Sequence, residues 1–139
     1  MIQIIAGGKG TGKTKELITK ANDAALLSVL PIIYLDKNNK HMYELSNQIR
    51  MINISDFHIE NFQMFCGFLY GIASQDYNLK EIYLDSFLTI AHIEPSELEQ
   101  ALEAMARFSD SQGIDLVISV SMSADEMTAA AKELVTVSL

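Results

Sequence analysis

A run of glycine, lysine and threonine near the start of the sequence has the composition and spacing that phosphate chemistry requires. Residues 7–14 read GGKGTGKT and match the pattern G-x-x-x-x-G-K-[ST]. Glycines let the backbone curl so that successive N–H groups point inward, and a helix that begins there adds partial positive charge. Lys13 would neutralise the β- and γ-phosphates of a nucleotide, and the Thr14 hydroxyl would coordinate Mg²⁺. The predicted nucleotide-binding residues of this segment are Gly7, Gly8, Lys9, Gly10, Thr11, Gly12, Lys13, Thr14 and Lys15.

A second acidic group for Mg²⁺ is expected at the end of a neighbouring hydrophobic strand. Residues 81–85 read EIYLD, so Asp85 follows a strand-like run. Ligands of open parallel sheets bind at the carboxyl ends of the strands, where both this segment and the glycine-rich segment end. We therefore predict Lys13 and Asp85 as the catalytic residues, and Thr14 and Asp85 as the metal ligands. The alternative is that Asp85 only caps the segment that follows it.

Strand and helix patterns alternate along the chain, and this alternation must position those residues. Strand patterns occupy residues 2–5, 32–35, 81–85 and 115–120, and helix patterns occupy residues 13–27, 58–74 and 94–112. Residues 49–54 and 134–139 are candidates for further strands. A capping box at Ser123 and Glu126 predicts a last short helix. The sequence thus predicts an α/β fold, a three-layer sandwich around a mainly parallel sheet of about five strands. Residues 1–139 form a single nucleotide-binding domain in this prediction.

Composition and charge exclude several classes of function. The net charge is −8; residues 1–50 carry seven Lys or Arg against four Asp or Glu, and residues 51–139 carry three against fourteen. The acidic remainder disfavours a nucleic-acid partner, which needs a basic surface. The longest apolar stretch, residues 24–35, is too short to span a bilayer, and no room is left for a signal peptide before the first strand. Cys66 is the single cysteine, so we expect a reducing, cytoplasmic setting and no membrane.

Two segments of the chain resemble the P-loop NTPases. The glycine-rich segment is similar to their Walker A element, and Asp85 is similar to their Walker B aspartate. The helical segment and further strand after Asp85 resemble the additional-strand branch, which includes RecA-like and AAA-type ATPases. The chain also resembles small stand-alone bacterial P-loop proteins sometimes labelled twitching-motility ATPases. The resemblance is motif-specific over residues 2–20 and 81–86 and topological elsewhere; it implies a P-loop NTPase fold, ATP or ADP as ligand, and Mg²⁺.

The departures from the family pattern concern hydrolysis. Hydrolytic members of this branch usually carry a Glu after the Walker B aspartate, whereas this chain has Ser86, and a serine hydroxyl is a poor general base. Arginine is scarce, and without an arginine finger turnover should be slow. The resemblance would make Ser119 or Ser121 a sensor of the γ-phosphate, with Ser121 better placed at the strand end; hydrogen bonding at the strand terminus is the alternative. Other acidic and basic groups that composition offers are Glu16, Glu44, Glu81, Arg50 and Arg107.

An aromatic stretch, Phe62–Ile72, is apolar over a wide arc of its predicted helix. Either the helix packs on the sheet, or its outer side also forms a surface for a homo-oligomer or a protein partner.

The function predicted from these features is a nucleotide-dependent switch or ATPase subunit with slow or partner-dependent NTP hydrolysis. One alternative is a phosphotransferase that acts on a small molecule, with Asp36 or Asp56 as the acceptor-side base. The other is a non-catalytic interaction domain that retains the fold.

Overall fold

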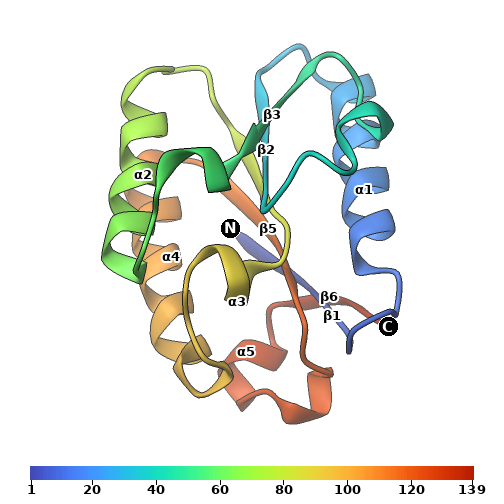
Figure 1. Cartoon of the computed structure of the whole chain (residues 1–139), viewed down its shortest axis with the longest axis vertical. Helices are drawn as coiled ribbons and strands as arrows, with labels where there is room; N and C mark the ends of the chain where they lie inside the picture. Colours follow the sequence, from blue (N-terminus) through green and yellow to red (C-terminus); the bar gives the residue numbers. More distant parts are fainter.

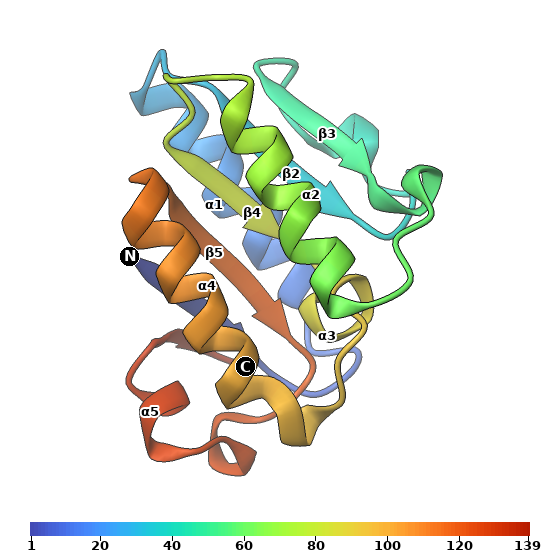
Figure 2. The same ribbon diagram turned by 90° about the vertical axis from the view of Figure 1, so that its left-hand side faces the viewer.

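One all-parallel sheet of six strands forms the centre of the molecule. The computed structural model describes residues 1–139 (Figures 1 and 2). The spatial order of the strands is β3-β2-β4-β5-β1-β6. Their bounds are β1 (Ile2–Ala6), β2 (Ile32–Asp36), β3 (Ile49–Asn53), β4 (Glu81–Leu84), β5 (Asp115–Val120) and β6 (Val135–Ser138). The sheet therefore has six strands where the sequence predicted about five, because both candidate segments, residues 49–54 and 134–139, form its outer strands β3 and β6.

Helices cover both faces of the sheet, so the molecule has three layers. Figure 1 shows α1 (Lys13–Leu27) on one face, and α2 (Phe62–Ser74) with α4 (Leu98–Gln112) on the other. Two short helices, α3 (Phe87–Ile90) and α5 (Ala129–Lys132), lie in connections. The predicted α/β three-layer arrangement is confirmed. No helix of the chain combines the length and the apolar composition that crossing a bilayer requires.

Side chains of the central strands alternate between two hydrophobic cores. Ile4, Leu84 and Ile118 belong to the larger core beneath α2 and α4, while Ile5 and Val117 belong to the smaller core beneath α1. Strands buried on both faces read as continuous apolar runs, which is why these segments were recognisable in the sequence.

Helix α2 packs its aromatic stretch on the sheet. Phe65 and Leu69 are fully buried against the larger core, whereas Met64 and Tyr70 remain exposed. The helix begins at Phe62 rather than at residue 58 because Asn61 caps it, its Oδ1 accepting from the Met64 N–H at 2.8 Å. The packing half of the prediction for Phe62–Ile72 is confirmed.

The order of the strands places β5 between the two strands that precede the candidate residues. Ile118 of β5 is in register with Ile4 of β1 on one side and with Leu84 of β4 on the other. The strand pattern predicted at residues 115–120 is thus the central neighbour of β1. Since every strand is parallel, the carboxyl ends of β1, β2, β4 and β5 meet at one edge of the sheet.

Candidate functional site

The glycine-rich segment joins β1 to α1 in a tight loop. Gly10 and Gly12 have φ angles of +76° and +93°, which side-chain-bearing residues rarely adopt. Gly7 is required for a different reason: a Cβ there would lie 2.5 Å from Thr11 Oγ1 and 3.1 Å from Leu139 Cβ. The Gly7 N–H also donates to the Met122 carbonyl at 2.8 Å. The loop therefore has a fixed path, held in part by the last third of the chain.

Lys13, the first residue of α1, folds back over this loop. Its Nζ donates to the Gly8 carbonyl at 2.7 Å, and the side chain is buried. Burial lowers the pKa of Lys13, the Asp85 carboxylate opposes that shift, and Lys37 adds to it. The ammonium group is thus held over the loop next to a carboxylate and a second lysine.

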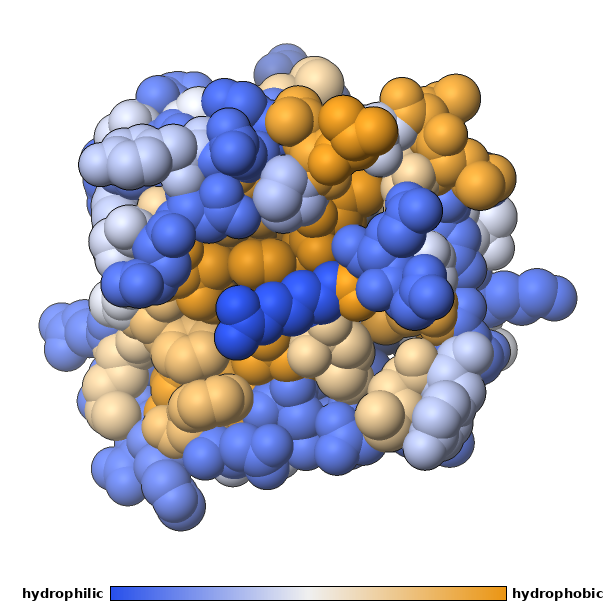
Figure 3. Space-filling view, turned by 90° about the horizontal axis from the view of Figure 1, so that it is seen from above, coloured by the Kyte–Doolittle hydropathy of each residue, from blue (hydrophilic) through white to orange (hydrophobic).

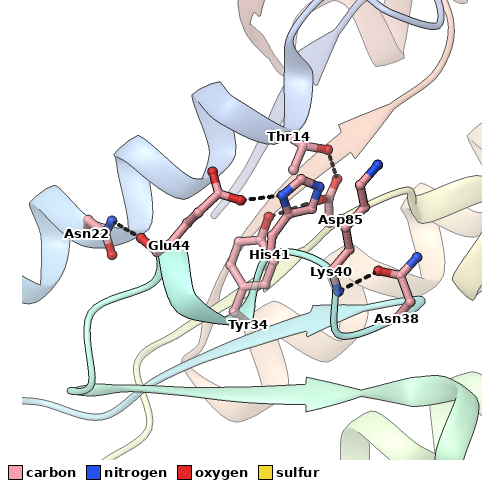
Figure 4. A network of polar contacts seen from close by, with 8 residues as sticks. All are labelled: Thr14, Asn22, Tyr34, Asn38, Lys40, His41, Glu44 and Asp85. Atoms are coloured by element: carbon pink, nitrogen blue, oxygen red, sulfur yellow. Dashed lines mark hydrogen bonds and ion pairs between the residues drawn. The ribbon is translucent and has the colours of Figure 1, made fainter.

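Asp85 lies immediately after β4, and its carboxylate accepts hydrogen bonds from three hydroxyl groups, of which Figure 4 shows those of Thr14 and Tyr34. Its Oδ1 accepts from Ser119 Oγ at 2.7 Å and from Thr14 Oγ1 at 3.3 Å, and its Oδ2 accepts from Tyr34 OH at 2.9 Å. Burial and the Asp85 carboxylate raise the pKa of Tyr34, which keeps this phenol a donor. Residues of α1, β2 and β5 thus position one buried carboxylate.

Ser86 turns the chain sharply away from β4. Its φ is +56°, a left-handed conformation that costs a non-glycine residue about 1–2 kcal/mol. Its N–H donates to Ser119 Oγ at 2.8 Å, so Ser119 links Asp85 to the turn that follows it. The turn leads into α3, which forms one wall of the site.

Asp36, the last residue of β2, is a second buried carboxylate at this edge. Leu35 is in register with Leu84, so Asp36 and Asp85 leave adjacent strands side by side. Asp36 Oδ1 accepts from the Lys37 N–H at 2.7 Å, whereas Oδ2 is buried without a partner. Burial, and after it the neighbouring Asp85, raise the pKa of Asp36.

A cleft of about 770 Å³ opens above these residues. The loop side of the cleft is formed by Lys9, Gly10, Gly12, Lys13, Thr14 and Ser121. The opposite side is formed by Leu88, Thr89, Ile93, Glu94 and Pro95, and Lys37 and Asp85 complete the lining together with Ser86. Its position at the carboxyl ends of parallel strands is where open α/β sheets bind their ligands.

The structure brings most of the predicted site residues together in this cleft, but four lie outside its lining. Gly7 packs against Leu139, and Lys15 is exposed on α1. The Gly8 carbonyl accepts hydrogen bonds from Lys13 and, at 2.7 Å, from Thr11 Oγ1. Among the other carboxylates, Glu81 stands at the opposite end of β4, away from the cleft.

Sequence reasoning missed several residues of this site. Tyr34, Lys37, Thr89 and Glu94 were not predicted. Of the two predicted serines, Ser119 contacts Asp85 directly and Ser121 lines the cleft. A signal existed for Lys37, since it follows a buried strand whose carboxyl end meets the same edge. Nothing in the local sequence indicated the opposite wall.

Metal ligation by the protein alone is not seen: no three His, Cys, Asp or Glu side chains lie close enough to hold a metal ion. Comparisons with known proteins add no assignment, because no family model matches the chain and no curated protein is significantly similar to it.

Proposed function

We propose that the chain is a nucleotide-binding protein of the P-loop NTPase class that binds ATP or ADP with Mg²⁺ in this cleft. The observation that carries the proposal is that Lys13, Thr14 and Asp85 line one cleft beside the glycine-rich loop. That loop leads directly into a helix of 15 residues, whose N-terminus carries partial positive charge. Lys9 and Lys37 add further positive charge around the same space.

The position of β5 supports the additional-strand branch of that class, to which RecA-like and AAA-type ATPases belong. One strand, β5, separates β1 from β4, so the strand before the loop and the strand before Asp85 are not neighbours. The chain order of the loop, Asp85 and then this strand agrees with the resemblance of the sequence.

The side chains of the cleft suit the roles that phosphate binding requires. An entering phosphate would take the place of the Gly8 carbonyl as the acceptor for Lys13 Nζ. Thr14 and Asp85 would hold Mg²⁺, with Asp85 acting through a water molecule. One carboxylate and one hydroxyl suit Mg²⁺, because this ion keeps several waters and binds one or two carboxylates together with substrate phosphates. Mg²⁺ would neutralise charge on the phosphates.

Slow or partner-dependent turnover is the second part of the proposal. Ser86 occupies the position after Asp85, and its N–H is committed to Ser119. Arg50 and Arg107 are the two arginines of the chain, and neither lines the cleft. A nucleotide-dependent switch or an ATPase subunit therefore fits these residues better than a rapid hydrolase.

A phosphotransferase that acts on a small molecule is the second candidate function, and Asp36 is the observation that favours it. This carboxylate has one oxygen without a partner and a raised pKa, which suits a group that accepts a proton from a hydroxyl. Neither Asp36 nor Asp56, the other predicted acceptor-side base, lines the cleft, but Asp36 is buried beside Asp85 whereas Asp56 is exposed in the 3₁₀ turn after β3. Transfer of the γ-phosphate of ATP to an organic hydroxyl, rather than to water, would distinguish this candidate.

Thermal unfolding of the wild type and Lys13→Ala tests the central proposal, with ATP, ADP and GTP, each with and without Mg²⁺. A ligand at ~100 times its dissociation constant stabilises the fold by about 2.7 kcal/mol. We expect a Mg²⁺-dependent rise of several degrees in the wild type and none in Lys13→Ala.

Lys132→Ala is the matched control, because Lys132 is exposed on α5 and lines no part of the cleft. It should keep the full nucleotide-dependent rise. The absence of any shift in the wild type at millimolar nucleotide would contradict the proposal and favour a non-catalytic interaction domain. A shift that survives Lys13→Ala would place the nucleotide somewhere else.

A further inference from the structure

The end of the molecule opposite the cleft exposes a cluster of aliphatic side chains. Leu26 and Leu27 end α1, and Val29 and Leu30 follow in the connection to β2. Leu26 is 85% exposed, Leu27 is 90% exposed and Val29 is fully exposed. Figure 3 looks onto this end and shows patches of hydrophobic residues, in orange, between hydrophilic residues, in blue. Contiguous exposed apolar surface of this kind marks interaction sites in folded proteins.

An apolar groove of about 490 Å³ adjoins this cluster. Ile33 and Ile52 contribute from β2 and β3, and Phe68 and Ile72 contribute from α2. Pro31 directly follows the exposed cluster and also lines the groove, so the cluster and the groove are adjacent. The edge strand β3 runs along the groove and has no strand on its other side.

Two opposite charges border the same groove without neutralising each other. Arg50 of β3 and Asp76, which follows α2, both line it. The ion pairs within the chain are those of the N-terminal amine with Asp115 and of His41 with Glu44, so Arg50 and Asp76 have none. The border of the groove therefore presents a cation and an anion that a partner surface can pair with.

We propose that this face binds a second copy of the chain, whose residues 26–30 enter the groove while the groove of the second copy receives the same residues in return. A two-fold interface is isologous, so the surface that forms it must be complementary to itself. This face meets that condition twice, since it combines an exposed apolar segment with an apolar groove and an unpaired cation with an unpaired anion. In the dimer, Arg50 of each copy faces Asp76 of the other.

A membrane is a poorer occupant for this surface. Of the charged residues that line the hollows around residues 26–30 and the groove, Arg50 and Lys80 are basic, and Asp76, Glu81 and Asp115 are acidic. Anionic lipid headgroups would meet a net negative charge there, whereas surface binding of an apolar segment is strengthened by basic residues.

The interface is independent of the proposed nucleotide site. Residues 26–30 lie where the strands begin, and the groove shares no lining residue with the cleft, so both clefts of the dimer stay open to ligand. Part of the predicted partner surface on Phe62–Ile72 takes part, since Phe68 and Ile72 form a wall of the groove.

Sedimentation equilibrium of the full chain, from submicromolar to high micromolar concentration, tests the proposal. We expect a monomer–dimer equilibrium in the wild type and a dissociation constant at least tenfold higher for Val29→Glu, which would bury an unpaired carboxylate. Tyr43→Glu is the matched control, because Tyr43 is 92% exposed and does not line the groove, and it should leave the equilibrium unchanged. Circular dichroism establishes that each variant is folded.

Charge exchange tests the reciprocal arrangement. Arg50→Glu should weaken the dimer, because two carboxylates then face each other, and Arg50→Glu with Asp76→Arg in the same chain should recover most of the lost affinity. A wild type that stays monomeric, a dimer insensitive to Val29→Glu, or a double variant no better than Arg50→Glu would each overturn the proposal. None of these outcomes depends on whether the chain binds nucleotide.

Discussion

Two neighbouring carboxylates of the cleft edge differ in how their oxygens are used. Asp85 accepts hydrogen bonds from three hydroxyl groups, whereas Asp36 accepts one from the backbone and leaves Oδ2 buried and unpaired. A buried acceptor without a partner costs about 1–3 kcal/mol. The negative charge of Asp85 adds to that cost when Asp36 is ionised, so an ionised Asp36 lowers the free energy of unfolding.

Asp36→Asn should raise the stability at neutral pH by about 1 kcal/mol, since the amide cannot ionise. The pKa of Asp36 is raised in the folded chain, so the folded state keeps its proton to higher pH than the unfolded state. The wild type therefore loses stability as the pH rises from the unfolded value, about 3.9, through the raised folded value. Urea unfolding between acid and neutral pH measures this loss.

The slope attributable to this residue should be absent in Asp36→Asn. Asp56→Asn, a change of an exposed aspartate, should keep the wild-type slope. A variant that is less stable than the wild type at neutral pH would show that Asp36 is ionised and favourable in the folded chain.

Residues of the site that carry a local motif were predictable, and those that act through distant contacts were not. Lys13 and Thr14 follow glycines at fixed spacing, and Asp85 ends an apolar run, so each is visible in a short window. Tyr34 and Ser119 reach Asp85 from positions 51 and 34 residues away in the sequence. Such contacts depend on the order of strands in the sheet, which no window of the sequence contains.

At the scale of elements, the loop between β1 and α1 contains two adjacent glycines, Gly7 and Gly8, whose surroundings differ. A Cβ on Gly7 would lie 2.5 Å from Thr11 Oγ1 and 3.3 Å from the Leu139 carbonyl, whereas a Cβ on Gly8 would meet nothing within 4 Å. Gly7 is needed because the end of the chain packs over it; Gly8 contributes only its backbone.

Gly7→Ala should destabilise the chain by about 1–3 kcal/mol, the usual range for forcing extra volume into a packed site. Gly8→Ala is its matched control and should change the free energy of unfolding by a few tenths of a kcal/mol at most. Urea denaturation with the same probe for both variants measures the difference. Equal effects of the two substitutions would mean that the contact with Leu139 is not part of the stable fold.

The four inner strands were predictable because each is buried on both faces and reads as an unbroken apolar run. The two edge strands were left open, since β3 and β6 have one neighbour each and mix buried with exposed positions. The helix predicted from residue 94 begins with a 3₁₀ turn, Pro95–Glu97, before α4. Apolar spacing does not distinguish a tight first turn from an α-helical one.

At the scale of the whole molecule, the two ends of the sheet have opposite surface chemistry. The carboxyl ends of the strands carry the cleft with Lys9, Lys13 and Lys37, and the other end carries the exposed aliphatic residues of the α1–β2 connection. The exposed aliphatic residues are thus concentrated at the end of the sheet away from the three lysines.

Pairing across the sheet sets an order for folding. β2 pairs with β3 after a short connection, whereas β1 pairs only with β5 and β6 from the last third of the chain. Closing the longer connection costs more entropy. In refolding followed by pulsed hydrogen exchange, the β1 amides should gain protection together with those of β5 and no earlier. Protection of β1 ahead of β5 would contradict this order.

The same pairing has a consequence during synthesis on the ribosome. β1 leaves the ribosome before either of its partners exists, and the loop after it depends on later residues: the Gly7 N–H bonds to Met122, and the Leu139 N–H bonds to Ala6. A nascent chain therefore carries the glycine-rich sequence long before it carries the site. Until β5 and β6 emerge, β1 is an apolar strand without a partner on either side, the kind of segment that makes incompletely folded chains prone to aggregation.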